Sequence, residues 1–421
     1  MRILYICSDT GIPVRGGKGA SVHVREFISA LTRAGHSVVL AAQVLNKSPW
    51  ERPANIEADV IHVEAEPQTI AVSKRFELFN QAIGATNILP KEIRKVLYNQ
   101  DMHERLFRKF RKTPPDIIYE RASLYGIAGA LLSRDLNVPR LVELNAPLTE
   151  ENTRYQNASG LGPLSEQSER WSLMEAEFVL PVSEALRKHV ISKGLAPNRV
   201  VVVPNAVDES VFYPDRPDPF VRNAWKLGDG PVMGFVGGLR PWHGVEWLPE
   251  LLEVLQKRFK NLQFMIVGEG PLREKLTSDF KRRDLTEKVI FTGSLPHESI
   301  AKLIRQFDIA LAPYPRLDHT FYFSPLKLFE YMACGIPVVA ADIGQITEVV
   351  RNDETGLLYP PGNFEALTKA CSKLLSDPGL RERFGKAAPV RIQKTYTWSR
   401  NVERVIRLAE QSISKKREAH Q

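Results

Sequence analysis

Short continuous apolar runs alternate with longer segments of helical period along this chain, and the alternation starts twice. Continuous apolar strands separated by helices are typical of parallel sheets covered by helices on both faces. The expected strands are residues 2–7, 37–42, 117–120, 141–143, 178–182 and 200–203 in the first run, and 232–236, 264–267, 289–291, 309–312 and 337–340 in the second. The sequence therefore predicts an α/β protein with two parallel sheets of similar size.

A segment rich in proline, aspartate and glycine, residues 204–231, separates the two runs and has the composition of an interdomain linker. We therefore expect an N-terminal domain of residues 1–212, a C-terminal domain of residues 213–396 and a last segment of residues 397–421. Open parallel sheets bind ligands at the carboxyl ends of their strands, so the expected site is a cleft shared by the two domains.

The composition is that of a globular protein, because 43% hydrophobic and 25% charged residues exclude a disordered or fibrous chain. The three cysteines lie far apart without C-x-x-C spacing, so neither a disulfide framework nor a zinc site is expected. The first residues lack the features of a signal peptide, and no apolar stretch approaches the ~18 residues needed to span a bilayer. These features together predict a cytoplasmic protein.

One basic segment, residues 74–112, interrupts the alternation of strands and helices. It contains ten basic and four acidic residues, so it carries +6 of the chain's net charge of +8. Its apolar residues have helical spacing, which leaves two readings open: a solvated insertion that packs on its own domain, or peripheral contact with the anionic inner face of a membrane. A nucleic-acid partner is not expected.

A glycine cluster follows the first expected strand and precedes the first expected helix. Gly16 and Gly17 stand there with Lys18 and Gly19. Glycines let backbone amides come close to an anion, and the start of a helix adds partial positive charge. The spacing matches neither G-x-G-x-x-G nor the P-loop pattern, so a generic phosphate loop and a flexible turn are both consistent with it.

A second glycine turn, Gly237 and Gly238, follows the first strand of the second run and leads to Arg240 and His243. A guanidinium can hold two phosphate oxygens at once, so we expect Arg240 to bind phosphate, with His243 in the same loop. The alternatives are a surface ion pair for Arg240 and a packing or capping role for His243.

A helix start later in the chain has the pattern of an anion site. Ser324 is a good N-cap, and Pro325 suits the first helical position because no amide proton is needed there. The amides of Leu326 and Lys327 would then point toward a phosphate. Glu330, about one turn later, can accept hydrogen bonds from ribose hydroxyls. This combination favours a nucleotide site over the alternative, an ordinary capped helix with a solvated glutamate.

Several segments, taken in order, resemble the retaining glycosyltransferases of family 4, which have the GT-B fold. They are LPVSEALRKHVISK (180–193), VPNAVD (203–208), VGEGP (267–271), FTG (291–293), FEYMACGIPVV (329–339) and TGLL (355–358). The resemblance covers most of the chain. It implies two Rossmann-like domains whose parallel sheets face a cleft, and a last helix that packs back on the first domain.

The resemblance also implies that the acceptor binds to the first domain, residues 1–212, and that a sugar-nucleotide donor lies mainly on the second, residues 213–396. Glu330 matches the glutamate that holds the ribose, and the amides after Pro325 match those at the donor phosphates. Gly17 matches the loop that closes on the diphosphate. Arg240 resembles the phosphate-binding arginine, and Leu295 falls near the base.

Three positions depart from the family pattern. Tyr322 stands where a first glutamate contacts the donor sugar, and His243 stands where a lysine usually precedes a glycine. Asn145 stands where a histidine often lies near the reacting carbon, but its carbonyl oxygen can still face a developing oxocarbenium ion. The departures predict a variant subgroup, marked by Asn-Ala-Pro and Ser-Pro-Leu-Lys motifs, and leave the donor sugar open.

The implied function is transfer of a hexosyl group from a nucleotide-diphosphate sugar, UDP favoured over GDP, to a hydroxyl acceptor with retention of configuration. The acceptor is a glycan, a lipid-linked glycan or a small molecule, as in polysaccharide or glycosylated-metabolite biosynthesis. No Asp-x-Asp motif occurs, so neither a metal nor another cofactor is expected. The residues assigned to catalysis are Asn145, Arg240 and Lys327, and those assigned to the donor are Gly16, Gly17, Arg240, His243, Leu295, Tyr322, Ser324, Pro325, Leu326, Lys327 and Glu330.

Two other classes stay open at this point. A non-catalytic binding protein of the same fold would explain the three departures. An enzyme with another reaction on this fold, such as a sugar-nucleotide epimerase or a phosphorylase, would form product without an added acceptor or would need free phosphate.

Overall fold

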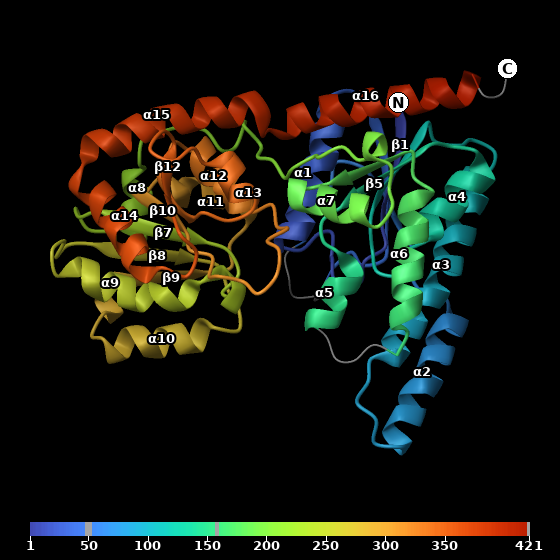
Figure 1. The fold of residues 1–421 in the computed structure, drawn as a ribbon, viewed down its shortest axis with the longest axis horizontal. Coiled ribbons are helices and arrows are strands. Elements are labelled where there is room, and N and C mark those ends of the chain that lie inside the picture. The colour runs from blue at the N-terminus through green and yellow to red at the C-terminus, as the bar shows by residue number, and fades with distance from the viewer. Residues whose placement is uncertain (47–52, 156–159, 419–421) are drawn as a thin grey trace. The chain divides into compact units, whose positions relative to one another are not determined.

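The computed structural model describes residues 1–46, 53–155 and 160–418 (Figure 1). The chain forms two compact units, of which the first comprises Met1–Pro204 together with the residues from Asn401 onward, and the second comprises Asn205–Arg400. Each unit contains one six-stranded sheet whose paired strands are all parallel. The expected α/β class with two parallel, Rossmann-like sheets is therefore confirmed.

The strands of the first sheet are β1 (Arg2–Cys7), β2 (Ser37–Ala42), β3 (Asp59–His62), β4 (Ile117–Arg121), β5 (Arg140–Leu144) and β6 (Phe178–Pro181). Their order in the sheet is β3-β2-β1-β4-β5-β6. The chain thus runs outward from β1 to β3 and returns to β4 on the other side of β1. The carboxyl ends of β1 and β4 form the switch point at which open α/β sheets commonly bind ligands.

The helices of the first unit are α1 (Gly19–Arg33), α2 (Pro67–Ala82), α3 (Leu89–Phe110), α4 (Ala128–Leu136), α5 (Leu148–Tyr155), α6 (Gly162–Met174), α7 (Glu184–Ser192) and most of α16 (Trp398–Glu418). One face of α3 is buried, because Tyr98, Met102, Leu106 and Phe110 recur every four residues and pack with strand residues such as Ile118. The reading of the basic segment as an insertion that packs on its own domain therefore holds for α3.

The preceding helix, α2, has different surroundings. Its buried residues are the polar Thr69, Ser73 and Asn80. Leu78 and Phe79 are instead 65% and 59% exposed, so this helix presents apolar side chains to solvent. No helix in the described part of the chain is both long enough and apolar enough to cross a bilayer.

The second sheet consists of β7 (Val232–Val236), β8 (Gln263–Val267), β9 (Val289–Gly293), β10 (Ile309–Ala312), β11 (Val338–Ala341) and β12 (Gly356–Tyr359), in the order β12-β11-β10-β7-β8-β9. Its central strands β7 and β10 are buried along their full length. The order reverses between these two strands, so the switch point of this unit lies at their carboxyl ends.

The helices of the second unit are α8 (Pro219–Ala224), α9 (Leu248–Gln256), α10 (Arg273–Arg282), α11 (His297–Ile304), α12 (Leu326–Ala333), α13 (Gln345–Val349), α14 (Phe364–Ser376) and α15 (Pro378–Thr395). Asn363 and Asp377 begin α14 and α15 as N-caps, each accepting a hydrogen bond from the amide three residues later. The α12 helix follows β10 directly in the chain, which brings its first turn to the switch point.

The strand expected at residues 200–203 is wrong. The segment runs beside β6, where the amides of Val201 and Val203 donate to Val179 and Pro181, but only Val200 forms a bridge. Pro181 has no amide proton to return, so the ladder cannot continue. The structure also contains β3 and β12, which were not predicted.

Candidate functional site

The switch point of the second unit brings three loops together: the glycine turn after β7, the glycine turn after β8, and the start of α12. The turns are joined by backbone hydrogen bonds, since the Gly237 amide donates to Val267 and the Leu239 amide donates to Glu269. At Gly268 a Cβ atom would lie 2.1 Å from the carbonyl oxygen of Gly237. The close approach of the two backbones therefore requires glycine at this position.

The Lys327 side chain, from the first turn of α12, crosses this glycine turn and is 7% exposed. A Cβ atom at Gly237, whose φ is +139°, would lie 2.8 Å from Lys327 Nζ. The ammonium lies 4.2 Å from the ring centre of Phe235 and 5.6 Å from that of Tyr314. The site thus places an amine at the carboxyl ends of β7 and β10.

The Lys327 amine has no hydrogen-bond partner among the described residues. Burial lowers its pKa to about 7, against the ordinary value of 10.5. The two aromatic rings offset part of the cost of burying the charge, but they accept no conventional hydrogen bond. A buried cation without an acceptor is the group that an anionic ligand would satisfy.

The His243 ring lies beside the same turn and donates from Nδ1 to the carbonyl oxygen of Gly238, at 2.6 Å. Burial and the neighbouring Lys327 lower the pKa of His243 to about 3, so the imidazole is neutral at physiological pH. Its ring packs edge-on against Tyr314 at 5.7 Å. His243 therefore packs against its neighbours and offers Nε2 as a hydrogen-bond acceptor, and it carries no positive charge.

Arg240 is exposed at the edge of the turn, and its guanidinium lies 5.2 Å from the ring centre of Trp242. No acidic side chain among the described residues pairs with it. The described contacts therefore do not support the alternative that Arg240 belongs to a surface ion pair. The positive charges at this site come from Arg240 and Lys327.

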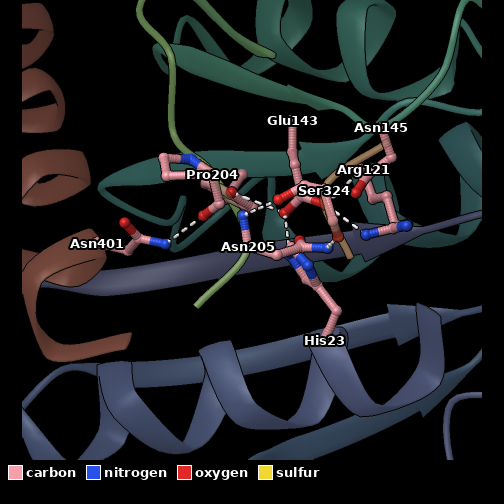
Figure 2. Close-up of polar contacts among 9 residues, drawn as sticks. His23, Arg121, Glu143, Asn145, Pro204, Asn205, Ser324 and Asn401 are labelled. Carbon is pink, nitrogen blue, oxygen red and sulfur yellow. Dashed lines mark hydrogen bonds and ion pairs between the residues drawn. The ribbon is translucent and has the colours of Figure 1, made fainter. Parts of the chain in front are cut away.

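The start of α12 differs from the expected cap. The helix begins at Leu326, and its N-cap is Pro325, whose side chain has no hydrogen-bond acceptor. The expectation that Ser324 caps the helix is therefore wrong. The Ser324 hydroxyl instead accepts from the Asn205 amide at 2.9 Å, and Asn205 Nδ2 donates to the Ser324 carbonyl (Figure 2). The first-turn amides of Leu326 and Lys327 thus have no side-chain cap and stay available to an anion.

Glu330 is 5% exposed, so the alternative of a solvated glutamate is wrong. Its Oε1 atom lies 2.8 Å from Nε2 of His297, at the start of α11, and the His297 ring packs against Phe212 at 5.2 Å. This contact orients the carboxylate from a helix that neighbours α12. The second carboxylate oxygen takes no part in this contact.

Two predicted donor residues lie in apolar surroundings. Leu295 is partly buried and packs against the core of the second unit. Tyr322 is 3% exposed and lies in an aromatic group, with its ring centre 4.4 Å from that of Phe323 and 5.9 Å from that of His319. Both residues therefore pack among apolar or aromatic side chains of the second unit.

The remaining predicted residues belong to the first unit and are described there. The Gly16 amide donates to Pro13 at 2.8 Å, and its carbonyl oxygen accepts from Arg25 of α1 at 2.6 Å. A Cβ atom at Gly17 would have no neighbour within 4 Å. The glycine loop is thus held by α1 on one side and open on the other.

Asn145, at the carboxyl end of β5, belongs to a buried cluster around Glu143 (Figure 2). Glu143 is 2% exposed and accepts hydrogen bonds from His23 of α1 and Tyr119 of β4, both at 2.8 Å. Arg121 forms an ion pair with the same carboxylate. Burial alone would raise the pKa of Glu143, but His23 and Arg121 hold it well below the ordinary value.

The Glu143 carboxylate also fixes the amide of Asn145, whose Nδ2 donates to Glu143 Oε1. This contact engages the nitrogen of the half-buried amide and does not involve its carbonyl oxygen. The cluster therefore holds the amide of Asn145 at the end of the strand.

Sequence reasoning missed His23, Arg121 and Glu143 of this cluster, and also His297 beside Glu330. Glu143 carried a signal, because a carboxylate inside an apolar strand is rare unless it is paired. His297 carried none, because its partner lies 33 residues away in the sequence.

Two family models match successive parts of the chain: the model for a "Glycosyl transferase 4-like domain" matches residues 18–206, and the model for "Glycosyl transferases group 1" matches residues 218–391. Among curated proteins, alpha-D-kanosaminyltransferase of Streptomyces kanamyceticus is 27% identical over 271 residues, which are 62% of this chain and 67% of that protein.

Two solved structures share the fold. Sucrose-phosphate synthase of Thermosynechococcus elongatus superposes with a TM-score of 0.72 at 20% identity, over 98% of this chain and 99% of that one. HepE of Anabaena in complex with UDP superposes with a TM-score of 0.71 at 17% identity, over 98% and 100% of the two chains. At these identities the superpositions support the fold alone.

Proposed function

Because the chain belongs to the GT-B glycosyltransferases, we propose that it is a retaining hexosyltransferase whose donor is a nucleotide-diphosphate sugar. The observation that carries this proposal is the buried amine of Lys327 at the switch point of the second unit, which has no hydrogen-bond partner in the described part of the chain. Phosphate oxygens would accept hydrogen bonds from this amine and from the first-turn amides of α12.

In the transfer step the bond between the anomeric carbon and a phosphate oxygen breaks, and a bond from that carbon to the acceptor oxygen forms on the same face. The proton of the acceptor hydroxyl passes to an oxygen of the leaving phosphate. The products are a glycoside and a nucleoside diphosphate. Negative charge grows on the diphosphate as the bond breaks, and Lys327, Arg240 and the α12 amides would stabilise it.

We propose that this stabilisation needs no metal. His243 is neutral, so the cationic groups are the exposed guanidinium of Arg240 and the buried amine of Lys327. A guanidinium can hold two phosphate oxygens, and a packed amine presents its charge without reorganisation.

For the nucleoside, we propose that Glu330 accepts hydrogen bonds from the ribose hydroxyls through the oxygen that His297 leaves open, and that Leu295 lies near the base. A UDP-sugar is the favoured donor. The similar fold of HepE, which was solved in complex with UDP, supports this choice.

On the acceptor side, we propose that Asn145 acts near the reacting carbon and that the Gly16–Gly17 loop closes on the diphosphate. The engaged Nδ2 of Asn145 leaves its carbonyl oxygen to face the developing oxocarbenium ion. The open side of Gly17 leaves room for phosphate oxygens. The acceptor itself is a hydroxyl of a glycan, a lipid-linked glycan or a small molecule.

Peripheral membrane contact through α2 is also proposed. Leu78, Phe79 and Ile83 are each more than half exposed on or directly after this helix, with the exposed cations Lys74 and Arg75 one to two turns earlier. Apolar side chains flanked by cations suit the interface of an anionic bilayer.

A turnover experiment tests the proposed function. Purified protein is incubated with UDP-glucose, UDP-galactose and GDP-mannose and a panel of hydroxyl acceptors, and the anomeric configuration of the product is read by NMR. We expect release of nucleoside diphosphate together with an α-linked product from an α-linked donor. A β-linked product, or tight nucleotide binding with no turnover for any acceptor, would contradict the proposal.

A further inference from the structure

A cavity of about 650 Å³ lies within the first unit, at the carboxyl ends of β1, β2 and β3. This volume is typical of small-molecule sites. Its polar lining includes Thr10, Gln43 and His62 from the loops and ends of the strands, Lys91, Arg94 and Lys95 from α3, and Asn152 from α5, together with the carboxylates Glu64 and Glu92. All of these residues belong to one unit, so the cavity is complete within it.

The wall formed by α3 is cationic. Lys91, Arg94 and Lys95 are spaced i, i+3 and i+4, so they lie on one face of the first two turns of the helix. Among the described residues none of the three forms an ion pair. Three cations on one face of a helix, without ion-pair partners among the described residues, favour an anionic ligand.

The two carboxylates of the lining offset part of this charge, but among the described residues neither forms an ion pair with the three cations, so the lining keeps a net positive charge. Glu64 is 80% exposed and lies 3.8 Å from His62. Glu92 is buried, and its two oxygens accept hydrogen bonds from the Tyr125 hydroxyl at 2.7 Å and the Gly160 amide at 2.9 Å. The carboxylate of Glu92 is therefore held by groups outside the cationic face.

Asn152 gives an independent indication of a ligand. Its side chain is 6% exposed, and its Oδ1 atom has no hydrogen-bond partner among the described residues. Buried amide oxygens are nearly always satisfied in folded proteins. Asn152 lines the cavity, and a ligand hydroxyl that reaches this oxygen would satisfy it.

We infer that this cavity binds a phosphorylated acceptor, with the phosphate on Lys91, Arg94 and Lys95 and a hydroxyl on Asn152. The inference rests on the proposed function, because it names the chemical class of the acceptor in that reaction. A soluble phosphate ester of a polyol or sugar and the headgroup of a phospholipid share this chemistry.

Isothermal titration calorimetry in saturating UDP tests the site. UDP occupies the phosphate-binding groups of the second unit, so they are not available to the phosphate probes. The probes are glycerol 3-phosphate, glycerol and vesicles of phosphatidylglycerol. We expect glycerol to give no signal and at least one phosphate probe to bind. The double variant Arg94→Gln/Lys95→Gln should weaken that probe roughly tenfold or more, and Asn152→Ala should weaken it by a smaller factor.

The matched control is Arg105→Gln/Lys109→Gln, which removes the same charge from exposed positions of the same helix. It should change the affinity of the phosphate probe less than about twofold, because distant charges are screened. Binding of soluble glycerol 3-phosphate identifies a soluble acceptor. Binding of the vesicles alone, abolished by the Arg94 and Lys95 substitutions, identifies a lipid headgroup.

The inference is overturned if the two double variants weaken the phosphate probe equally, or if neither phosphate probe responds to the Arg94 and Lys95 substitutions. A separate titration with UDP distinguishes this failure from failure of the proposed function. If the wild-type protein and all variants bind UDP, the second unit binds nucleotide, and only the acceptor assignment is refuted. If the wild-type protein does not bind UDP, the proposed function falls.

Discussion

At the residue scale, the Lys327 amine couples protonation to ligand binding. Its pKa is about 7 because it is buried, so the amine of the ligand-free protein titrates near neutral pH. A diphosphate favours the ammonium, so binding above pH 7 takes up a proton. We expect UDP affinity to fall as pH rises from 7 to 9, by up to about tenfold per pH unit.

Calorimetric titration of UDP across this pH range checks the coupling. Lys327→Arg is the control, because a guanidinium stays charged throughout and the pH dependence above 7 should disappear if this variant binds. An affinity of wild-type protein that does not change between pH 7 and 9 would show that Lys327 is not the titrating group.

The same residue carries a cost in stability. The pKa of Lys327 in the folded protein is lower than in the unfolded chain, so the cost of burying its charge is complete below pH 7 and is relieved as pH rises toward 10.5. We therefore expect Lys327→Met to raise the free energy of unfolding at pH 7 by roughly 1–4 kcal/mol. Urea denaturation of ligand-free protein measures this change, and a destabilised variant would contradict it.

At the element scale, Glu143 connects α1, β4 and β5 through His23, Tyr119 and Arg121. Replacing it leaves two buried basic groups without their carboxylate, so Glu143→Gln should lower the free energy of unfolding by about 3–5 kcal/mol. Tyr119→Phe, which removes one hydrogen bond and leaves the ion pair, should cost only about 1 kcal/mol. Equal losses in urea denaturation would show that the ion pair is not the main contribution.

The pH dependence of this cluster has the opposite sign to that of Lys327. Because the folded-state pKa of Glu143 lies below the ordinary value of 4.5, its contribution to stability is present above pH 4.5 and is lost as pH falls below it. Wild-type protein should therefore lose more stability than Glu143→Gln between pH 5 and pH 3. Parallel loss in the two proteins would contradict this account.

The elements that the sequence predicted well are those with long apolar runs. The strands Arg2–Cys7, Ser37–Ala42 and Val232–Val236 were expected with the bounds that the structure gives. Strand β3 was missed because it is short and begins with a charged residue, and β12 was missed because it is equally short and begins with glycine. Such strands form because a neighbouring strand is already in place, which is tertiary context that no local pattern contains.

The candidate site was predictable to the extent that it follows motifs. Lys327 and Glu330 were found because a helix start after a strand is an anion site by its own geometry. The partner of Glu330, His297, and the partner of Glu143, His23, are set by the packing of helices against a sheet. His23 and Glu143 lie 120 residues apart, so their contact was beyond the reach of sequence spacing.

At the scale of the whole molecule, most of the excess positive charge lies in one segment that forms two helices with different surroundings. The basic segment supplies +6 of the net +8, and the structure divides it between α2, with exposed apolar residues, and α3, whose first turns line a cavity. We expect Phe79→Ser/Ile83→Ser to reduce cosedimentation with phosphatidylglycerol vesicles several-fold, because two apolar contacts with the bilayer are lost.

The control for this test is Val390→Ser, which removes an exposed apolar residue of the second unit. It should leave cosedimentation unchanged. Equal binding of all three proteins to the vesicles would show that α2 makes no contact with the bilayer.

The central claim is that the second unit binds a nucleoside diphosphate through the amine of Lys327. Calorimetric titration of UDP into wild-type protein and Lys327→Met at pH 7 tests it most directly, because methionine keeps the apolar stem and removes only the charge. We expect saturable binding to the wild type and affinity about 10–100-fold lower in the folded variant. Equal affinity in the two proteins would contradict the account.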